Sequence, residues 1–437
     1  MTRNFILMLT AQGLLALLSY ILNLILTRYL PMEEYGQLRY VISITSILIF
    51  LTNPGLSSAV FKCVVEGYHR FVARAYRLTL KYSLWGSLIL FLLSLYFFGW
   101  KKDPQTAWLT ALGAVFFPAM FLDRWIMVYL AKGLFARART LETAVKLASI
   151  VLAGCAAFFT GKVITVMICM FLAHLVLNPL FAARSLKLLE PTEEDSARDR
   201  KYVSYSTRLT LYTLLPNMAK HLDKILIASF LDFKALSLYY IATIVPLYFQ
   251  SGLKSGINVP VQNWVSQGKT EALKKFSRNQ WIVLGLSVLT SAALYIAMPL
   301  IISLFGNAYQ DSAQFAQILC LSFIVYPYTT LFFMMLTFLG EERFTGLALN
   351  VHSLAKTLLF LLALPYYGIT GIVCTQVLMD FAWFGVAIVR LRKLEARWFK
   401  EAVPACPAPA ELEKQAGPGD SSRLPDTGLS SEDYTET

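Results

Sequence analysis

Residues 5–26, FILMLTAQGLLALLSYILNLIL, form an apolar block without a charged side chain. About twenty such residues in a helix cross the roughly 30 Å hydrocarbon core of a bilayer. Comparable blocks recur along the chain, which is 57% hydrophobic and only 15% charged, and this balance favours a membrane protein over a soluble one. We therefore predict an all-α integral membrane protein with about twelve transmembrane helices. The predicted spans are 5–27, 39–61, 78–98, 106–130, 141–160, 163–183, 206–230, 236–261, 281–305, 314–339, 345–366 and 369–389.

The basic residues are distributed unevenly between the loops. With the N-terminus in the cytoplasm, most of the 39 Lys and Arg residues fall in cytoplasmic segments, as the positive-inside rule expects. The inverted topology would violate this rule in nearly every loop. We therefore expect both termini to be cytoplasmic, and the net charge of +12 needs no nucleic-acid partner. The basic residues at the outer side are Arg28, Arg39, Lys101, Lys102, Lys162 and Lys234.

The polar stretch EPTEEDSARDRK, residues 190–201, separates the first six spans from the last six. At an offset of 201 residues, Gly55 aligns with Gly256 and Arg77 with Arg278. Six spans in each half would make such repeats parallel. Beyond the spans, a sequence rich in Pro, Ala, Gly, Ser and acidic residues predicts disorder. The expected organisation is an N-terminal six-helix lobe at 1–187, a cytoplasmic linker at 188–204, a C-terminal six-helix lobe at 205–393 and a disordered cytoplasmic tail at 394–437.

Charged residues inside the membrane are candidates for function, because each costs about 2.5–3.5 kcal/mol at a span centre. The seventh span contains the densest group, in which Lys220, Asp223 and Lys224 share one helical face. Asp223 neutralises only one lysine, and the remaining positive charge favours a water-filled cavity. The alternative is a structural ion pair inside a packed bundle.

The eighth span carries Lys254 within SGLKSGIN, residues 251–258, which ends at Asn258. Glycine and serine around a lysine favour a loosened helix, and broken helices at mid-membrane often mark transport sites. The repeat equivalent of Lys254 is Asn53, in the segment TNPGL of span two. We therefore expect helix-weakening segments at the same depth in both halves, although tolerated kinks are the alternative.

Other ionisable residues lie in or near the spans. Asp123 and Arg124 are adjacent in span four and would point about 100° apart on a helix. Asp380 lies in span twelve and Lys356 in span eleven. Near the span ends, long side chains can reach the interface, which applies to Arg28, Arg39 and Lys62; for Lys62, a position facing substrate at the cytoplasmic mouth is the other interpretation.

The sequence contains no motif for chemistry. It lacks a GxxxxGK[ST] phosphate-binding loop and a GxSxG nucleophile motif. Its six cysteines and four histidines are scattered without a metal-ligand spacing. We expect neither an enzyme nor a metal or other cofactor.

The motifs and their order resemble the bacterial polysaccharide-export flippases, a family of the multidrug/oligosaccharidyl-lipid/polysaccharide exporter superfamily. The resemblance covers nearly the whole span region, to about residue 393. The segments that carry it are RYLP at 28–31, EYG at 34–36, NPGL at 53–56, Lys62, LDKILI at 222–227, LYY at 238–240, residues 252–258 and GITG at 368–371.

The resemblance implies two six-helix lobes in a V around a central cavity that opens alternately to either side. It also implies a function, the translocation of undecaprenyl-pyrophosphate-linked oligosaccharide across the bacterial cytoplasmic (inner) membrane, with membrane lipids and polysaccharide-assembly proteins as partners. The oligosaccharide would be a repeat unit of O-antigen or another surface polysaccharide. Its pyrophosphate requires cations, and coupling to H⁺ or Na⁺ requires acids. The expected substrate-binding residues are Lys220, Lys224, Lys254, Arg124, Lys62, Asn53 and Asn258, and the expected ion-coupling residues are Asp223, Asp123 and Asp380.

Two other functions fit parts of the sequence. A multidrug/cation antiporter of the same superfamily should favour acidic cavity residues, whereas the basic residues inside the spans outnumber the acidic ones. An integral membrane glycosyltransferase or ligase would usually need a large outer loop, and the outer loops here are short. The basic residues inside the spans are Arg124, Lys220, Lys224, Lys254 and Lys356, against Asp123, Asp223 and Asp380.

Overall fold

The computed structural model describes residues 2–190, 193 and 195–402 of the 437-residue chain. Within this part, every element of regular structure is a helix. The described residues up to Arg390 form one compact unit, and those from Leu391 onward belong to a second. All the candidate site residues lie in the first unit.

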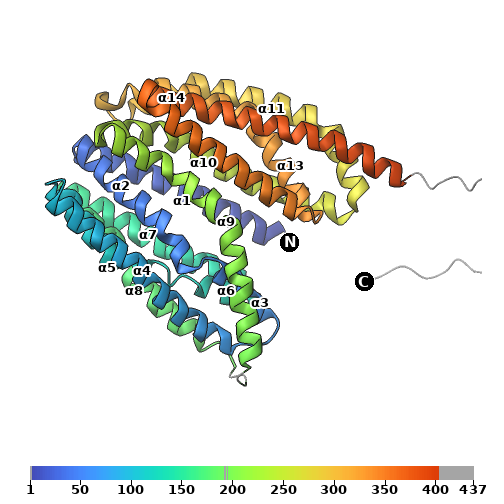
Figure 1. Cartoon of the computed structure of the whole chain (residues 1–437), viewed down its shortest axis with the longest axis horizontal. Coiled ribbons are helices and arrows are strands. Elements are labelled where there is room, and N and C mark those ends of the chain that lie inside the picture. Colours follow the sequence, from blue (N-terminus) through green and yellow to red (C-terminus); the bar gives the residue numbers. More distant parts are fainter. Residues whose placement is uncertain (1, 191–192, 194, 403–437) are drawn as a thin grey trace, which may run out of the picture. The chain divides into compact units, whose positions relative to one another are not determined.

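The first six predicted spans coincide with α1 to α8. In this region α4 packs against α5, α5 against α8, and α7 against both α8 and α1. Figure 1 shows α4, α5 and α8 together at one side of the unit. The bounds are α1 Thr2–Tyr29, α2 Met32–Leu48, the short 3₁₀ helix η1 Ile49–Thr52, α3 Gly55–Val65, α4 Arg70–Gly99, α5 Pro104–Met120, α6 Trp125–Ala131, α7 Phe135–Thr160 and α8 Val163–Leu186.

The last six predicted spans coincide with α9 to α14. Helix α10 packs against α12 and α13, which also contact α11. Trp383 of α14 stacks on Phe333 of α13, with ring centroids 4.1 Å apart. The bounds are α9 Ser196–Phe230, α10 Phe233–Ser266, α11 Lys269–Ser303, η2 Asn307–Tyr309, α12 Ser312–Cys320, η3 Leu321–Ile324, α13 Tyr326–Phe338 and α14 Glu342–Ala402.

Aspartates fix the starts of several helices. The Asp103 carboxylate accepts a hydrogen bond from the Thr106 amide at the start of α5. Asp195 and Asp232 cap α9 and α10 in the same way. Each cap satisfies backbone N–H groups that have no partner inside the helix.

Helix breaks only partly follow the sequence prediction. The break in span two is confirmed, because Asn53 separates η1 from α3 with a left-handed backbone (φ 53°, ψ 71°). The loosened helix expected around Lys254 is wrong, since α10 runs without a break from Phe233 to Ser266. Span four instead breaks at residues 121–124, so the helical angle assumed between Asp123 and Arg124 does not apply.

The helices also shift several expected boundaries. Helix α9 begins at Ser196, inside the predicted linker 188–204, because Asp195 caps it there. Spans eleven and twelve merge into α14 except at Gly368, whose φ of 57° and ψ of −139° interrupt the helix. The predicted tail at 394–437 begins within α14, and residues 403–437 lie outside the described part.

Within the described residues, seven helices are long and apolar enough to cross a membrane, or eight if the bent pair 312–324 and 326–338 forms one span. Helices α9 and α10 are not among them. These two helices carry Lys220, Asp223, Lys224 and Lys254. Length and apolarity alone therefore do not identify as spans the two helices that hold these candidates.

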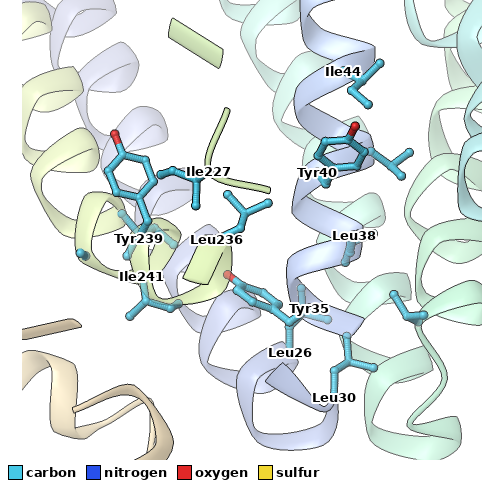
Figure 2. Close-up of a cluster of buried hydrophobic side chains, with 14 of the residues drawn as sticks. Leu26, Leu30, Tyr35, Leu38, Tyr40, Ile44, Ile227, Leu236, Tyr239 and Ile241 are labelled. Carbon is cyan, nitrogen blue, oxygen red and sulfur yellow. The ribbon is translucent and has the colours of Figure 1, made fainter. Parts of the chain in front are cut away.

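One packed core joins the two halves of the unit. Figure 2 shows Leu26 of α1 and Tyr35 and Leu38 of α2 in the same cluster as Leu236 and Tyr239 of α10. A second core, around α3, α4, α6 and the start of α9, contains Cys63 and Tyr202. Direct contacts between the halves run from α2 to α9 and α10, from α3 to α9 and from α1 to α10.

Candidate functional site

Asp223 and Lys224 form a buried ion pair in α9. The Lys224 Nζ lies 3.2 Å from the Asp223 Oδ1, and both side chains are less than a tenth exposed. Lys224 also donates to the Lys220 carbonyl at 3.0 Å, and Tyr239 of α10 donates to the Asp223 Oδ2 at 2.6 Å. Of the two lysines that share this helical face, Lys224 therefore forms the ion pair with Asp223.

Lys220, Lys254 and Lys356 form what we call the lysine cluster. The charge of Lys220 interacts with the charges of Lys254 and Lys356, although the three residues come from α9, α10 and α14. Lys220 and Lys254 are exposed, and the nearest polar partner of Lys220 is the Asn217 amide oxygen at 3.4 Å. Among the described residues, none of these three lysines has a carboxylate within 4 Å. The cluster therefore carries positive charge that no ion pair neutralises.

Asp380 lies near this cluster. Its carboxylate accepts a hydrogen bond from Gln376 at 3.0 Å, and it interacts electrostatically with Lys356, as does Asp223. The structure thus brings together five of the predicted site residues, namely Lys220, Lys224, Lys254, Asp223 and Asp380, and adds Lys356.

Arg124 lies elsewhere, in a hydrogen-bonded site at the break of span two. Its guanidinium donates to the Thr79 hydroxyl at 2.5 Å, to the Ser57 hydroxyl at 2.8 Å and to the Thr52 carbonyl at 2.8 Å. It also donates to the Asn53 carbonyl at 3.2 Å, and the residue is only 3% exposed. Four of the five N–H donors are used in this way, so in this conformation Arg124 stabilises the break.

Asn53 connects the same break to α9. Its amide donates to the Ser206 hydroxyl at 3.1 Å, and the Thr210 hydroxyl donates to its side-chain oxygen at 2.6 Å. The Gly55 amide donates to the Thr210 hydroxyl at 2.9 Å. We call these interactions the α3–α9 contact. A Cβ on Gly55 would lie 2.0 Å from the Ser206 carbonyl oxygen, so only glycine fits there.

The remaining predicted residues do not join the lysine cluster. Lys62 pairs with Glu66 at 3.8 Å and lies over the Tyr205 ring. Asp123 lies in the break between α5 and α6. Asn258 belongs to α10, but its side chain is outside the described part. Within that part, no three His, Cys, Asp or Glu side chains gather as metal ligands would.

A second close contact joins the two halves at the beginnings of α2 and α10. A Cβ on Gly36 would lie 2.0 Å from the Phe233 carbonyl oxygen, and the Ser237 hydroxyl donates to the Met32 carbonyl at 2.5 Å. We call this the α2–α10 contact. Arg39 lies beside this contact. The prediction that its side chain reaches the membrane interface from a span end is wrong, because Arg39 is only 8% exposed.

An ionic site at the start of α9 is not predicted by the sequence. Asp199 at the start of α9 pairs with Arg74 of α4 at 2.5 Å and accepts a hydrogen bond from Tyr68 at 3.0 Å. Tyr202 donates to Glu66 and stacks on Tyr68. Burial and the neighbouring Asp199 raise the pKa of Tyr68, so its hydroxyl stays a donor. The polar stretch 190–201 was the available signal, but it was interpreted only as a linker.

An open apolar groove of about 950 Å³ runs between α1 and α10. Leu17 and Tyr20 line it from α1, and Tyr248, Phe249 and Leu253 line it from α10. Leu253 precedes Lys254 directly, so the groove lies next to the segment that carries one member of the lysine cluster.

Residues 1–255 match the model of a protein family described as polysaccharide biosynthesis protein. The fold is similar to that of the lipid II flippase MurJ in an inward closed conformation, at 12% identity over 88% of this chain and 87% of that chain, with a TM-score of 0.70. A multidrug resistance MATE transporter of the MOP superfamily in an inward-facing conformation matches at 13% identity over 90% and 99% of the two chains, with a TM-score of 0.61.

A MOP superfamily transporter from Pyrococcus furiosus, described as having a binding pocket of reversed polarity, matches at 12% identity over 90% and 96% of the two chains, with a TM-score of 0.60. No curated protein sequence matches the chain. These similarities are to a transporter superfamily and not to enzymes.

Proposed function

Since the chain belongs to the polysaccharide biosynthesis protein family and has the fold of MOP superfamily transporters, we propose that it translocates an undecaprenyl-pyrophosphate-linked oligosaccharide across the bacterial cytoplasmic membrane. The chain would cross the membrane twelve times, with both termini in the cytoplasm and two six-helix lobes at 1–187 and 205–393. In this topology the α2–α10 contact lies at the outer end and the α3–α9 contact at the cytoplasmic end. Opening either contact would expose the region between the lobes to one side.

The lysine cluster is the observation that carries the proposal. Lys220 and Lys254 are exposed, although both belong to predicted spans. Charged side chains inside a membrane face a water-filled cavity and seldom face lipid. A cavity lined by lysines without carboxylate partners suits a ligand with several negative charges, and a pyrophosphate has them.

The other parts of the substrate have matching surroundings. The apolar groove between α1 and α10 would hold the first isoprene units beside Lys254, so that the rest of the prenyl chain stays in the lipid. The oligosaccharide would occupy the hydrated space between the lobes. Lys62 would meet substrate at the cytoplasmic mouth, and Asn258 stays a predicted substrate contact. Asn53 and Arg124 would act by holding the broken span.

Ion coupling would use the acids next to the cluster. Asp223 is already paired with Lys224, whereas Asp380 has an amide partner and interacts with Lys356. Asp380 is therefore the better placed of the two to exchange H⁺ or Na⁺. The third acid, Asp123, lies in the break between α5 and α6. Repeated exchange at Asp380 would change the charge that Lys356 presents to the head group.

A multidrug cation antiporter is the second candidate. Besides MurJ, the similar structures include a multidrug resistance transporter and another MOP superfamily transporter. The side chains do not favour it. The buried Asp223 carboxylate is neutralised by Lys224, and the positive charge of the lysine cluster would repel an organic cation.

The test is translocation of a labelled prenyl-pyrophosphate oligosaccharide by the purified full-length chain in liposomes. Lys220→Ala and Lys254→Ala should each reduce the rate by at least about tenfold, because each removes a charge-assisted contact of roughly 1.5–3 kcal/mol. Lys254→Arg should retain most of the rate. Lys274→Ala is the matched control, since Lys274 is exposed in the same half and pairs with Glu271.

Full activity of both alanine variants would refute the assignment of the head-group site. Active uptake of an organic cation by the wild-type protein, with no movement of the prenyl-linked sugar, would favour the antiporter instead.

A further inference from the structure

Arg39 is a buried cation between the two halves of the unit. Its Cζ lies 4.9 Å from the ring centroid of Tyr35 and 4.3 Å from that of Tyr240. Its Nη2 donates to the Asn23 side-chain oxygen, which also accepts a hydrogen bond from the Tyr35 hydroxyl at 2.9 Å. Three helices, α1, α2 and α10, therefore surround the guanidinium.

All of these partners are neutral. Within the described residues Arg39 has no ion pair, and its buried Nε has no hydrogen-bond partner. A buried charge normally has a carboxylate partner or a full set of hydrogen bonds. Tyrosine rings stabilise a guanidinium through cation–π interactions, but they leave the Nε donor and the net charge unused.

The rings that cover Arg39 come from opposite sides of the α2–α10 contact. Tyr35 belongs to α2, as Arg39 does, and Tyr240 belongs to α10. Separation of α2 from α10 would remove Tyr240 and leave Arg39 on the wall of the opening. Closure of this contact therefore completes the covering of the guanidinium.

We propose that Arg39 is a second anion-binding position, which is masked by Tyr240 in the closed state and binds the phosphates of the substrate after the α2–α10 contact opens. This proposal rests on the proposed function. The lysine cluster binds the head group on the cytoplasmic side of the cycle, and Arg39 binds it on the outer side before release. A guanidinium suits this step because its planar donors match phosphate oxygens in pairs.

The test measures binding of inorganic pyrophosphate to the purified full-length chain by isothermal titration calorimetry. All variants carry Lys220→Ala and Lys254→Ala, so that the lysine cluster does not contribute. Tyr240→Ala removes the covering ring, whereas the control Tyr240→Phe keeps it. We expect Tyr240→Ala to bind pyrophosphate at least about tenfold more tightly than Tyr240→Phe, because the binding-competent fraction increases. Adding Arg39→Gln to Tyr240→Ala should remove the whole gain.

Equal affinities of the Tyr240→Ala and Tyr240→Phe variants would overturn the proposal, as would a gain that survives Arg39→Gln. If Tyr240→Ala does not give a folded protein, Arg39→Lys and Arg39→Gln in the otherwise unchanged chain decide. An anion-binding role predicts that Arg39→Gln raises the half-saturating substrate concentration about tenfold, while Arg39→Lys raises it less. If both variants raise this concentration equally and lose thermal stability equally, Arg39 has a structural role only and the proposal is overturned. The calorimetric result does not depend on translocation, so failure of the proposed function gives a separate outcome.

Discussion

Gly55→Ala should prevent the α3–α9 contact from closing. The added methyl group would lie 2.0 Å from the Ser206 carbonyl oxygen, whereas ordinary contact begins at 3.4 Å. The methyl group is bonded directly to the Cα and the oxygen belongs to the main chain, so no side-chain rotation relieves the clash and the helices themselves must separate. Separation would break the three hydrogen bonds that join Asn53 and Gly55 to Ser206 and Thr210. At about 1 kcal/mol each, this loss is about 3 kcal/mol, or roughly a hundredfold change in the ratio of closed to open contact.

The native Cys63 reports on this change. Cys63 lies in α3, is fully buried and belongs to the same core as Tyr202 of α9. In a background in which Cys63 is the sole cysteine, Gly55→Ala should speed its alkylation by up to about a hundredfold and slow translocation. Gly99→Ala in α4 is the matched control, because its added methyl group meets nothing within 4 Å. An unchanged alkylation rate in Gly55→Ala would refute the reasoning.

Two further predictions concern residues outside the lysine cluster. Burial raises the pKa of the Cys63 thiol to about 12. At pH 8 this thiol should therefore react with a maleimide at least about tenfold more slowly than the thiol of an exposed Val65→Cys variant, and its rate should increase as the pH rises toward 12. Equal rates at pH 8 would contradict the burial. Arg124→Lys should lower the free energy of unfolding by about 3 kcal/mol, because an ammonium cannot replace the forked donors that reach Thr79 and Ser57. Thermal unfolding in detergent measures this, with the exposed Arg77→Lys as a control that should change little.

The sequence predicted where the helices lie, since apolar blocks mark them regardless of their tertiary contacts, although only seven or eight of the described helices are long and apolar enough to cross a membrane. It also predicted the break at Asn53, where Pro54 and Gly55 weaken a helix locally. The unbroken α10 contradicts the same reasoning applied to Lys254, because neighbouring α12 and α13 pack along α10 and glycine in a packed helix is tolerated. Local composition shows where a helix can break, and packing decides whether it does.

The candidate site was predictable as a set of residue types but not as an arrangement. Charge counting indicated that one carboxylate cannot neutralise both Lys220 and Lys224, and the ion pair of Asp223 with Lys224 agrees with this. The partners of Arg124 and the burial of Arg39 depend on contacts between residues far apart in the chain. The sequence therefore predicted Arg124 as a substrate-binding residue and Arg39 as a residue at a span end, whereas both are buried in contacts with distant residues.

At both ends of the interface, a glycine of one half touches a carbonyl oxygen of the other, Gly36 with Phe233 and Gly55 with Ser206. Such seals involve main chain, so their fit does not depend on the side chains that line the transport path. In the proposed cycle, mutations that change which substrate is accepted can accumulate on that path without disturbing how the two contacts close. A protein built in this way can acquire new specificities during evolution while it keeps one mechanical cycle.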